Sequence, residues 1–107
     1  MNKTMRLLPK FEVDPLVYVE GAARRVQHRF PHLGIKAGWV EAAETFVLEL
    51  DDDALIRKGL LNDLLLQFFN ELAAMGHPFS LGFGDASSPY LRLEEPLIVL
   101  PRLAQAA

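Results

Sequence analysis

The three histidines, His28, His32 and His77, are the side chains of this sequence best suited to metal binding. Imidazoles four residues apart on one helix can share an ion, but Pro31 interrupts the helical face between His28 and His32. The sequence contains no cysteine, which removes thiolate ligands, disulfides and a thiol nucleophile. We therefore expect no metal site and no cofactor.

The acidic run Asp51–Asp53 is the densest group of carboxylates. It lacks the glycine turn and the spaced oxygen ligands of a calcium loop. It precedes a predicted helix, whose free N–H groups and dipole favour negative charge. The glycine pair in Gly82–Asp85 is not followed by a helix that would bind phosphate, and no Gly-x-Ser-x-Gly elbow occurs. These patterns predict no catalytic residues.

The most polar feature is a basic face formed by Arg24, Arg25, His28 and Arg29, on one side of a predicted helix. In contrast, residues 41–53 hold six acidic side chains and no basic one. Arginine pairs bidentately with carboxylates, so this face is either solvated or docks an acidic partner. The four residues are candidate partner-binding residues.

A chain of 107 residues, 50% hydrophobic and 23% charged, has the size of one domain with one core. Its net charge of −3 and the lack of a Lys/Arg run argue against nucleic acid as a partner. Charges interrupt the longest apolar region, Leu55–Met75, which argues against a membrane span. No signal peptide is visible near the start. We expect a cytoplasmic protein with a flexible tail over residues 1–10 and one domain over residues 11–107.

The segment 11–18 is ambiguous between two structures. Its alternating apolar residues predict a strand, which Pro15 would confine to a sheet edge. The alternative is a helix that Asp14 caps and Pro15 begins. Because Val17, Tyr18 and Val19 have high strand propensity, we predict the strand.

Hydrophobic spacing predicts the remaining elements. They are a helix over 19–30, a hairpin of strands 34–40 and 45–50, a long helix over 54–75 closed by Gly76, and extended segments within 79–83 and 90–100. The resulting fold class is α+β, a single domain with two helices packed on an antiparallel sheet. Its β-α-β-β-α-β order is that of a ferredoxin-like fold.

The long predicted helix carries more apolar surface than one sheet can cover. Eight apolar side chains span about half of its circumference, against the ~100° stripe that packing on a sheet requires. They are Leu60, Leu61, Leu64, Leu65, Phe68, Phe69, Leu72 and Met75. Either other elements cover the excess, or it is a surface for self-association or for a protein partner. Leu61, Leu65 and Phe69 are the candidate contacts.

Two stretches resemble a known family. Tyr18–Phe30 resembles the tyrosine-to-Arg-Phe first-helix pattern of the small D-type proteins of His-Xaa-Ser systems, and Phe68–Leu72 is similar to the Phe-x-Asn-Glu-Leu stretch of their second helix. These proteins accompany radical-SAM enzymes thought to modify a His-Xaa-Ser repeat peptide, and they carry no assigned catalytic residues. The resemblance covers about Tyr18–Leu72, and the strand-like Phe79–Gly84 departs from the family's helical pattern.

The resemblance implies a small non-catalytic accessory protein, in agreement with the missing catalytic motifs. We expect it to engage a protein or peptide partner through the edge strand or the apolar helix face. The alternative is a small ferredoxin-like dimeric enzyme or ligand-binding protein. Its pocket would lie between the helices and the sheet and would use Tyr18, Arg24 or His28 as polar groups.

Overall fold

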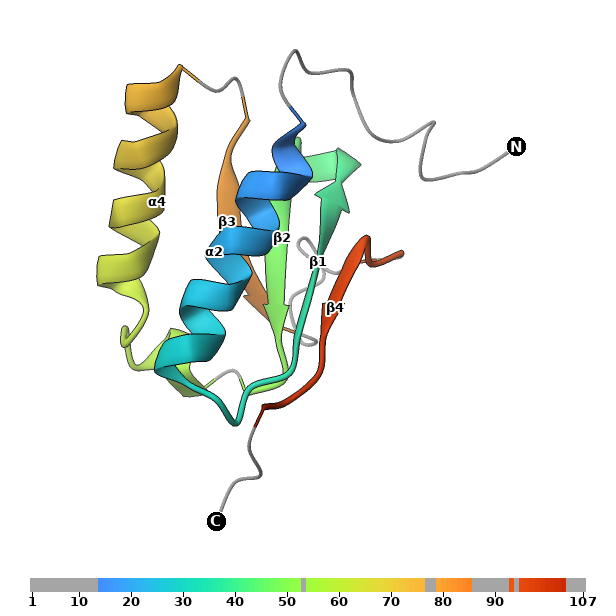
Figure 1. Cartoon of the computed structure of the whole chain (residues 1–107), viewed down its shortest axis with the longest axis vertical. Coiled ribbons are helices and arrows are strands. Elements are labelled where there is room, and N and C mark those ends of the chain that lie inside the picture. Colours follow the sequence, from blue (N-terminus) through green and yellow to red (C-terminus); the bar gives the residue numbers. More distant parts are fainter. Residues whose placement is uncertain (1–13, 53, 77–78, 86–92, 94, 104–107) are drawn as a thin grey trace.

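The computed structural model describes residues 14–52, 54–76, 79–85, 93 and 95–103. A four-stranded sheet in the order β3-β2-β1-β4 carries α2 and α4 on one face (Figure 1). In chain order the elements are α2 (Pro15–Arg29), β1 (Ile35–Val40), the 3-10 helix η1 (Glu41–Ala43), β2 (Thr45–Leu50), α3 (Ala54–Arg57), α4 (Asn62–Met75), β3 (Leu81–Asp85) and β4 (Ile98–Leu100). The α+β class is confirmed.

Helix α2 begins earlier than predicted, so the strand prediction is wrong from residue 15 to residue 18. The Asp14 carboxylate accepts a hydrogen bond from the Leu16 N–H at 3.0 Å, and Pro15 occupies the first turn. This start signal and the burial of Val19 in the core outweigh the local strand propensity. The rest of that predicted strand, residues 11–13, and the predicted tail over residues 1–10 lie outside the described residues.

The sheet is mixed, so the predicted antiparallel sheet and ferredoxin-like order are wrong. Strand β1 pairs antiparallel with β2 and with β4, whereas β2 pairs parallel with β3. After β2 the chain crosses one face of the sheet through α3 and α4 and then enters β3 beside β2 in the same direction (Figure 1). In the described residues the order is α-β-β-α-α-β-β.

The predicted hairpin of β1 and β2 is confirmed, with Trp39 opposite Phe46 and Ile35 opposite Leu50. The 3-10 helix η1 forms the turn, and Glu44 ends it at φ 49°. These four side chains lie on the face of the sheet that packs on the helices. Alternate residues of a strand share a face, so these alternate apolar residues of both strands point into the core.

The predicted long helix over 54–75 is broken in the middle. Helix α3 ends at Arg57, and Gly59 has φ +71°, a value that glycine adopts without steric strain. Both predicted helix ends are confirmed: the Asp52 carboxylate accepts a hydrogen bond from the Ala54 N–H at 3.0 Å, and Gly76 caps α4 at φ 69°. No helix in the described part of the chain is long and apolar enough to cross a membrane.

The core fills the space between the helices and one face of the sheet. Helix α2 packs on β1 and β4, and α4 packs on β3. The largest fully buried apolar side chains of the core come from α2, α4, the hairpin and the loops. They are Phe46, Phe68, Leu33, Ile35, Leu48, Leu61, Val19 and Val26. Val19 and Val26 therefore lie on the inward face of α2, opposite the basic face.

Gln27 is a polar residue in this core and is 2% exposed. Its Nε2 donates hydrogen bonds to the carbonyl oxygens of Leu33, at 3.1 Å, and Pro101, at 2.7 Å. A buried carbonyl oxygen that accepts no hydrogen bond destabilises the fold. The Gln27 amide supplies a donor to two carbonyl oxygens, in two separate segments of the chain. Gln27 thereby ties the end of α2 to the loop before β1 and to the segment after β4.

Candidate functional site

Helices α2 and α4 run antiparallel and are joined by polar side chains. The Arg25 guanidinium donates to both carboxylate oxygens of Glu71, at 2.8 and 3.0 Å, and to the Gln67 side-chain oxygen at 3.0 Å. The Tyr18 hydroxyl donates to the same Glu71 carboxylate at 2.9 Å. The Arg25 guanidinium also lies 4.8 Å from the centre of the Phe68 ring, within the range of a cation–π contact. Arg25 thus contacts three side chains of α4, and Tyr18 shares its partner Glu71.

The other charged members of the predicted basic face are also paired. Arg29 donates to both oxygens of the Asp63 carboxylate, at 2.8 and 3.0 Å, and Arg24 lies 3.7 Å from Glu20 one helical turn away. Each of the three arginines therefore has a carboxylate partner. Arg25 and Arg29 do not simply face solvent, because they bridge to α4.

These contacts shift the protonation equilibria of the groups involved. Burial, reinforced by the hydrogen bond to Glu71, raises the pKa of Tyr18 to about 12. The hydrogen bonds from Arg25 and Tyr18 lower the pKa of Glu71, and the bond to Glu71 raises the pKa of Arg25. At neutral pH each group keeps its ordinary charge. None of the three is poised to exchange a proton, as a general acid or base must.

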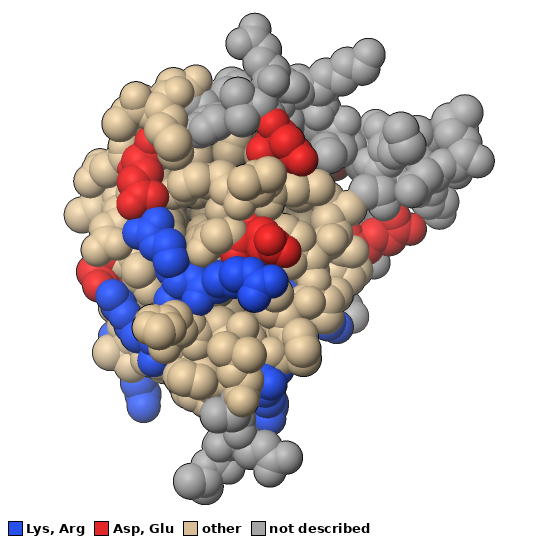
Figure 2. Space-filling view, in the orientation of Figure 1, with Lys and Arg blue, Asp and Glu red and all other residues tan. Residues whose placement is uncertain are grey.

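A hollow of about 490 Å³ lies over this junction. Its lining residues are Arg24, Arg25, His28, Arg29, Leu64 and Gln67. Figure 2 shows acidic side chains interspersed among the basic ones on this face. The arginine charges are balanced by neighbouring carboxylates, so the hollow is far less basic than the sequence of α2 indicates.

The other exposed flank of α4, which we call the outer face, has a different character. At 100° per residue, the members of this face occupy one continuous arc of the helix circumference. They are Asn62, Leu65, Leu66, Phe69, Asn70 and Ala73. Phe69 is 69% exposed and Leu66 is 60% exposed, while Leu65 is half-buried. The only charged residues of α4, Asp63 and Glu71, pair with α2, so the outer face is uncharged.

The predicted contact residues of the long helix separate accordingly. Leu61 is 2% exposed and lies in the core together with Leu64 and Phe68, which follow it at helical spacing. It is therefore not part of the outer face. Leu65 and Phe69 do lie on it. The predicted surplus of apolar surface is present at Leu66 and Phe69, and the elements that the structure describes do not cover it.

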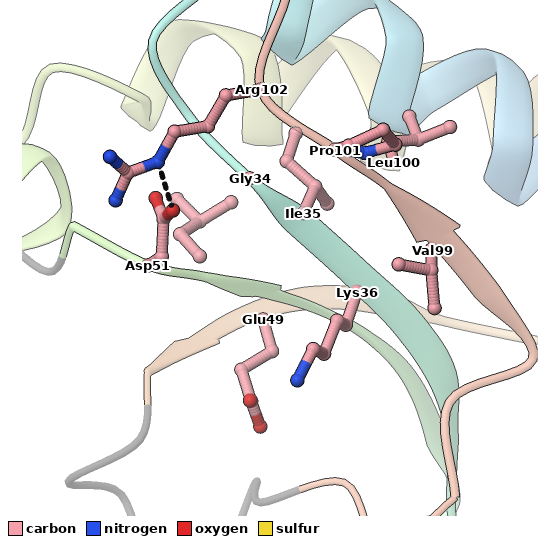
Figure 3. A pocket seen from close by; sticks show the side chains of 10 residues that line it. Gly34, Ile35, Lys36, Glu49, Asp51, Val99, Leu100, Pro101 and Arg102 are labelled. Atoms are coloured by element: carbon pink, nitrogen blue, oxygen red, sulfur yellow. Dashed lines mark hydrogen bonds and ion pairs between the residues drawn. The ribbon is translucent and has the colours of Figure 1, made fainter. Parts of the chain in front are cut away.

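A second hollow, also of about 490 Å³, lies on the face of the sheet opposite the helices (Figure 3). Lys36 and Glu49 project from β1 and β2, and Arg102 donates through Nε to the Asp51 carboxylate at 2.8 Å. A Cβ at Gly34 would lie 2.8 Å from a carboxylate oxygen of Asp51, so a larger residue there would make the Asp51 side chain shift. Two cations and two carboxylates therefore surround an apolar floor, which includes Val99.

The histidines lie apart from one another in the described structure. His28 is exposed on α2, and the His32 ring lies 3.7 Å from the Asp52 carboxylate. His77 lies outside the described residues. Within the described ranges, no three histidine or carboxylate side chains gather closely enough to hold a metal ion.

The carboxylate partners of the arginines were missed in the sequence, although a signal was present. Asp63, Gln67 and Glu71 repeat every four residues, and so do Arg25 and Arg29. Residues four apart share a helical face, so each set forms a row, and two rows of opposite charge match when the helices are antiparallel. Reading one helix at a time leaves this complementarity hidden.

Comparison with protein-family models, curated proteins and solved structures finds no match for this chain. The resemblance carried by Tyr18–Phe30 and Phe68–Leu72 stays a prediction. The geometry of the two helices and of the two hollows is therefore the basis on which a function is proposed.

Proposed function

We propose that this chain is a small non-catalytic accessory protein that binds a protein partner through the outer face of α4. The observation that carries the proposal is the exposure of Phe69 and Leu66 on a helical face without charge. Large aromatic and aliphatic side chains that are exposed side by side mark protein interaction sites more often than they mark ordinary surface.

The size of the available energy supports a binding role. Complete burial of a leucine or phenylalanine side chain contributes about 1.5–3 kcal/mol. Phe69 at 69% exposure and Leu66 at 60% exposure keep most of that contribution unrealised in the isolated chain. Because the outer face of α4 carries no charged side chain, burying Phe69 and Leu66 desolvates no charge of this helix.

The polar groups support the absence of catalysis by this chain. Tyr18, Arg25 and Glu71 satisfy one another, and the raised pKa of Tyr18 keeps its hydroxyl protonated. A catalytic group has to turn toward a substrate, whereas these turn toward each other and hold α2 against α4. We therefore assign them to the support of the binding helix.

The resemblance to the D-type proteins of His-Xaa-Ser systems suggests the process. We propose that the chain accompanies a radical-SAM enzyme during modification of a peptide. Phe69 belongs to the Phe68–Leu72 stretch that carries the resemblance, so the proposed contact residue and the resemblance fall on the same helix.

Photocrosslinking in cells tests the binding role. A benzophenone amino acid is placed at position 69 and, as the matched control, at position 17, because Val17 is 73% exposed on α2. We expect irradiation to give a discrete protein adduct from position 69 and none from position 17. Mass spectrometry then identifies the adduct.

A radical-SAM enzyme among the adducts would support the proposed process. If cells express such an enzyme together with this chain and the enzyme is not among the adducts, the proposed process is contradicted while the binding role stands. Equal or absent adducts at positions 69 and 17 would contradict the binding role itself.

A second candidate function is the binding of a small zwitterion, favoured by the hollow between Lys36, Glu49, Asp51 and Arg102. Arg102 and Asp51 are paired with each other, which leaves Lys36 and Glu49 to match the two charges of a free amino acid or a peptide end. Titration of free amino acids should shift the amide NMR signals of Gly34 and Val99, and Lys36→Gln should reduce the shifts. Unchanged spectra at millimolar concentrations would exclude this role.

A further inference from the structure

The outer face of α4 has a size pattern that fits its own copy. Leu65, Phe69 and Ala73 succeed one another at intervals of four residues along the same face. When a second α4 is laid antiparallel with Phe69 at the centre, each Leu65 meets the other copy's Ala73. A large side chain then faces a small one on both sides of the two phenylalanines, an alternation that lets helices pack closely.

We infer that the occupant of this face is a second copy of this chain, in a two-fold symmetric dimer with antiparallel α4 helices. The inference rests on the proposed binding role of the outer face and names its partner. In such an isologous interface each residue near the axis contacts the same residue of the other copy.

The charge pattern permits a second copy to pack against this face. A charged residue near a two-fold axis would face its own like charge, which opposes self-association. The outer face has none, because Asp63 and Glu71 point toward α2 and are paired with Arg29 and Arg25. Figure 2 shows basic and acidic side chains side by side where α2 and α4 meet, and further charged side chains elsewhere on this face of the molecule.

The area of the face sets the expected strength. Its leucine and phenylalanine side chains expose on the order of 300 Å² of apolar surface per copy. Two copies together would bury about 600 Å² of apolar surface, and because interfaces are a little over half apolar, the whole interface would be about 1,100 Å², just under the lower limit of about 1,200 Å² for stable specific complexes. The dimer should therefore be concentration-dependent rather than obligate.

Sedimentation equilibrium of the purified full chain, from about 1 μM to about 1 mM, measures this directly. The monomer has a mass of 12.0 kDa, and we expect the average mass to rise toward twice that value with concentration. Phe69→Glu should weaken association at least tenfold, because it places two carboxylates at the axis. The matched control Val17→Glu changes an equally exposed apolar residue on α2 and should dimerise like the wild type.

A mixture of Phe69→Glu and Phe69→Lys tests the symmetry. If residue 69 faces its own copy, the mixture should form a heterodimer while each variant alone stays monomeric. Circular dichroism should show both variants folded, since residue 69 lies outside the core.

The outcomes separate this inference from the proposed function. A wild-type chain that stays monomeric throughout, together with crosslinking of another protein from position 69, would overturn the dimer and keep the binding role. A dimer that Phe69→Glu leaves intact, or a mixture without a heterodimer, would overturn the inference. Absence of both association and crosslinking would overturn both proposals.

Discussion

The two exposed flanks of α4 differ in what their side chains contact. On the flank toward α2, Asp63 and Glu71 form ion pairs with Arg29 and Arg25. The charges of this flank are therefore paired with partners in the same chain. On the outer face, Phe69 has no charged neighbour on its helix face and is 69% exposed. The comparison teaches that a conspicuous charge pattern can be satisfied within the chain, while the most exposed large apolar side chains of the helix lie on the uncharged flank.

The comparison is sharpest at two adjacent phenylalanines, Phe68 and Phe69. Phe68 is fully buried and Phe69 is 69% exposed. We expect Phe68→Ala to lower the free energy of unfolding by about 3–5 kcal/mol through loss of packing and creation of a cavity. Phe69→Ala should change it by less than about 0.5 kcal/mol in the monomer. Urea unfolding at low micromolar concentration measures both.

Comparable losses for the two alanine variants would contradict the inward and outward assignment of α4. A larger effect of Phe69→Ala that appears only at high protein concentration would instead sharpen the comparison, because it would report the dimer.

The second prediction separates the arginines of α2. Arg25→Gln removes a bidentate ion pair and the contact with Phe68, and we expect it to lower the free energy of unfolding by about 1 kcal/mol. Arg24→Gln removes only an exposed pair at 3.7 Å and should stay within about 0.5 kcal/mol of the wild type. Thermal unfolding of the two variants under identical conditions distinguishes them. Equal values would mean that the junction between α2 and α4 contributes no more than ordinary surface charge.

The third prediction uses the tyrosine of that junction. Because the pKa of Tyr18 is raised from 10.0 to about 12, the folded chain holds its proton more tightly than the unfolded chain does. The resulting stabilisation is complete below pH 10 and is lost as the pH rises toward 12. Chemical unfolding between pH 9 and pH 12 should show a steeper loss of stability for the wild type than for Tyr18→Phe. Parallel curves would contradict the Tyr18 assignment.

The fourth and smallest effect is expected at acidic pH. The pKa of Glu71 is lowered from 4.5, chiefly by the hydrogen bond from Arg25, so its ionised form is favoured by folding. Its stabilising effect is present above pH 4.5 and is lost as the pH falls through the lower folded value. Glu71→Gln should flatten this part of the stability curve, as measured by urea unfolding from pH 6 to pH 3. An unchanged slope would show that the Arg25 contact is too weakly formed to matter.

Local patterns predicted the parts of the fold that depend on one segment. Hydrophobic spacing within residues 34–50 was enough to predict the hairpin, and Gly76 was enough to predict the end of α4. The strand prediction for residues 15–18 is wrong because the helix start signal of Asp14 and Pro15 competes there with strand propensity. Burial in the core favours the helix, and that burial depends on tertiary contacts that one segment does not reveal. Gly59 broke the long helix for the same reason, since the path of the chain into the core cannot be read from spacing alone.

The outer face was foreseen more completely than the polar junction. Excess hydrophobicity is a property of one helix, so Leu65 and Phe69 were identified from the sequence. The bonds of Arg25 to Glu71 and Gln67 span 46 and 42 residues, and they depend on how two helices are oriented. Counting charges on α2 alone therefore overstated the basic character of that surface.

The buried amide of Gln27 has a consequence for the order in which the chain is completed during synthesis. Its acceptor in Pro101 lies 74 residues later, an interval that translation covers in about 4–15 s. Throughout that time β4 cannot pair with β1, and one donor of α2 has only water as its partner. The emerging chain therefore exposes the β1 edge as a temporary pairing site, which closes when β4 pairs with β1 and Pro101 reaches Gln27.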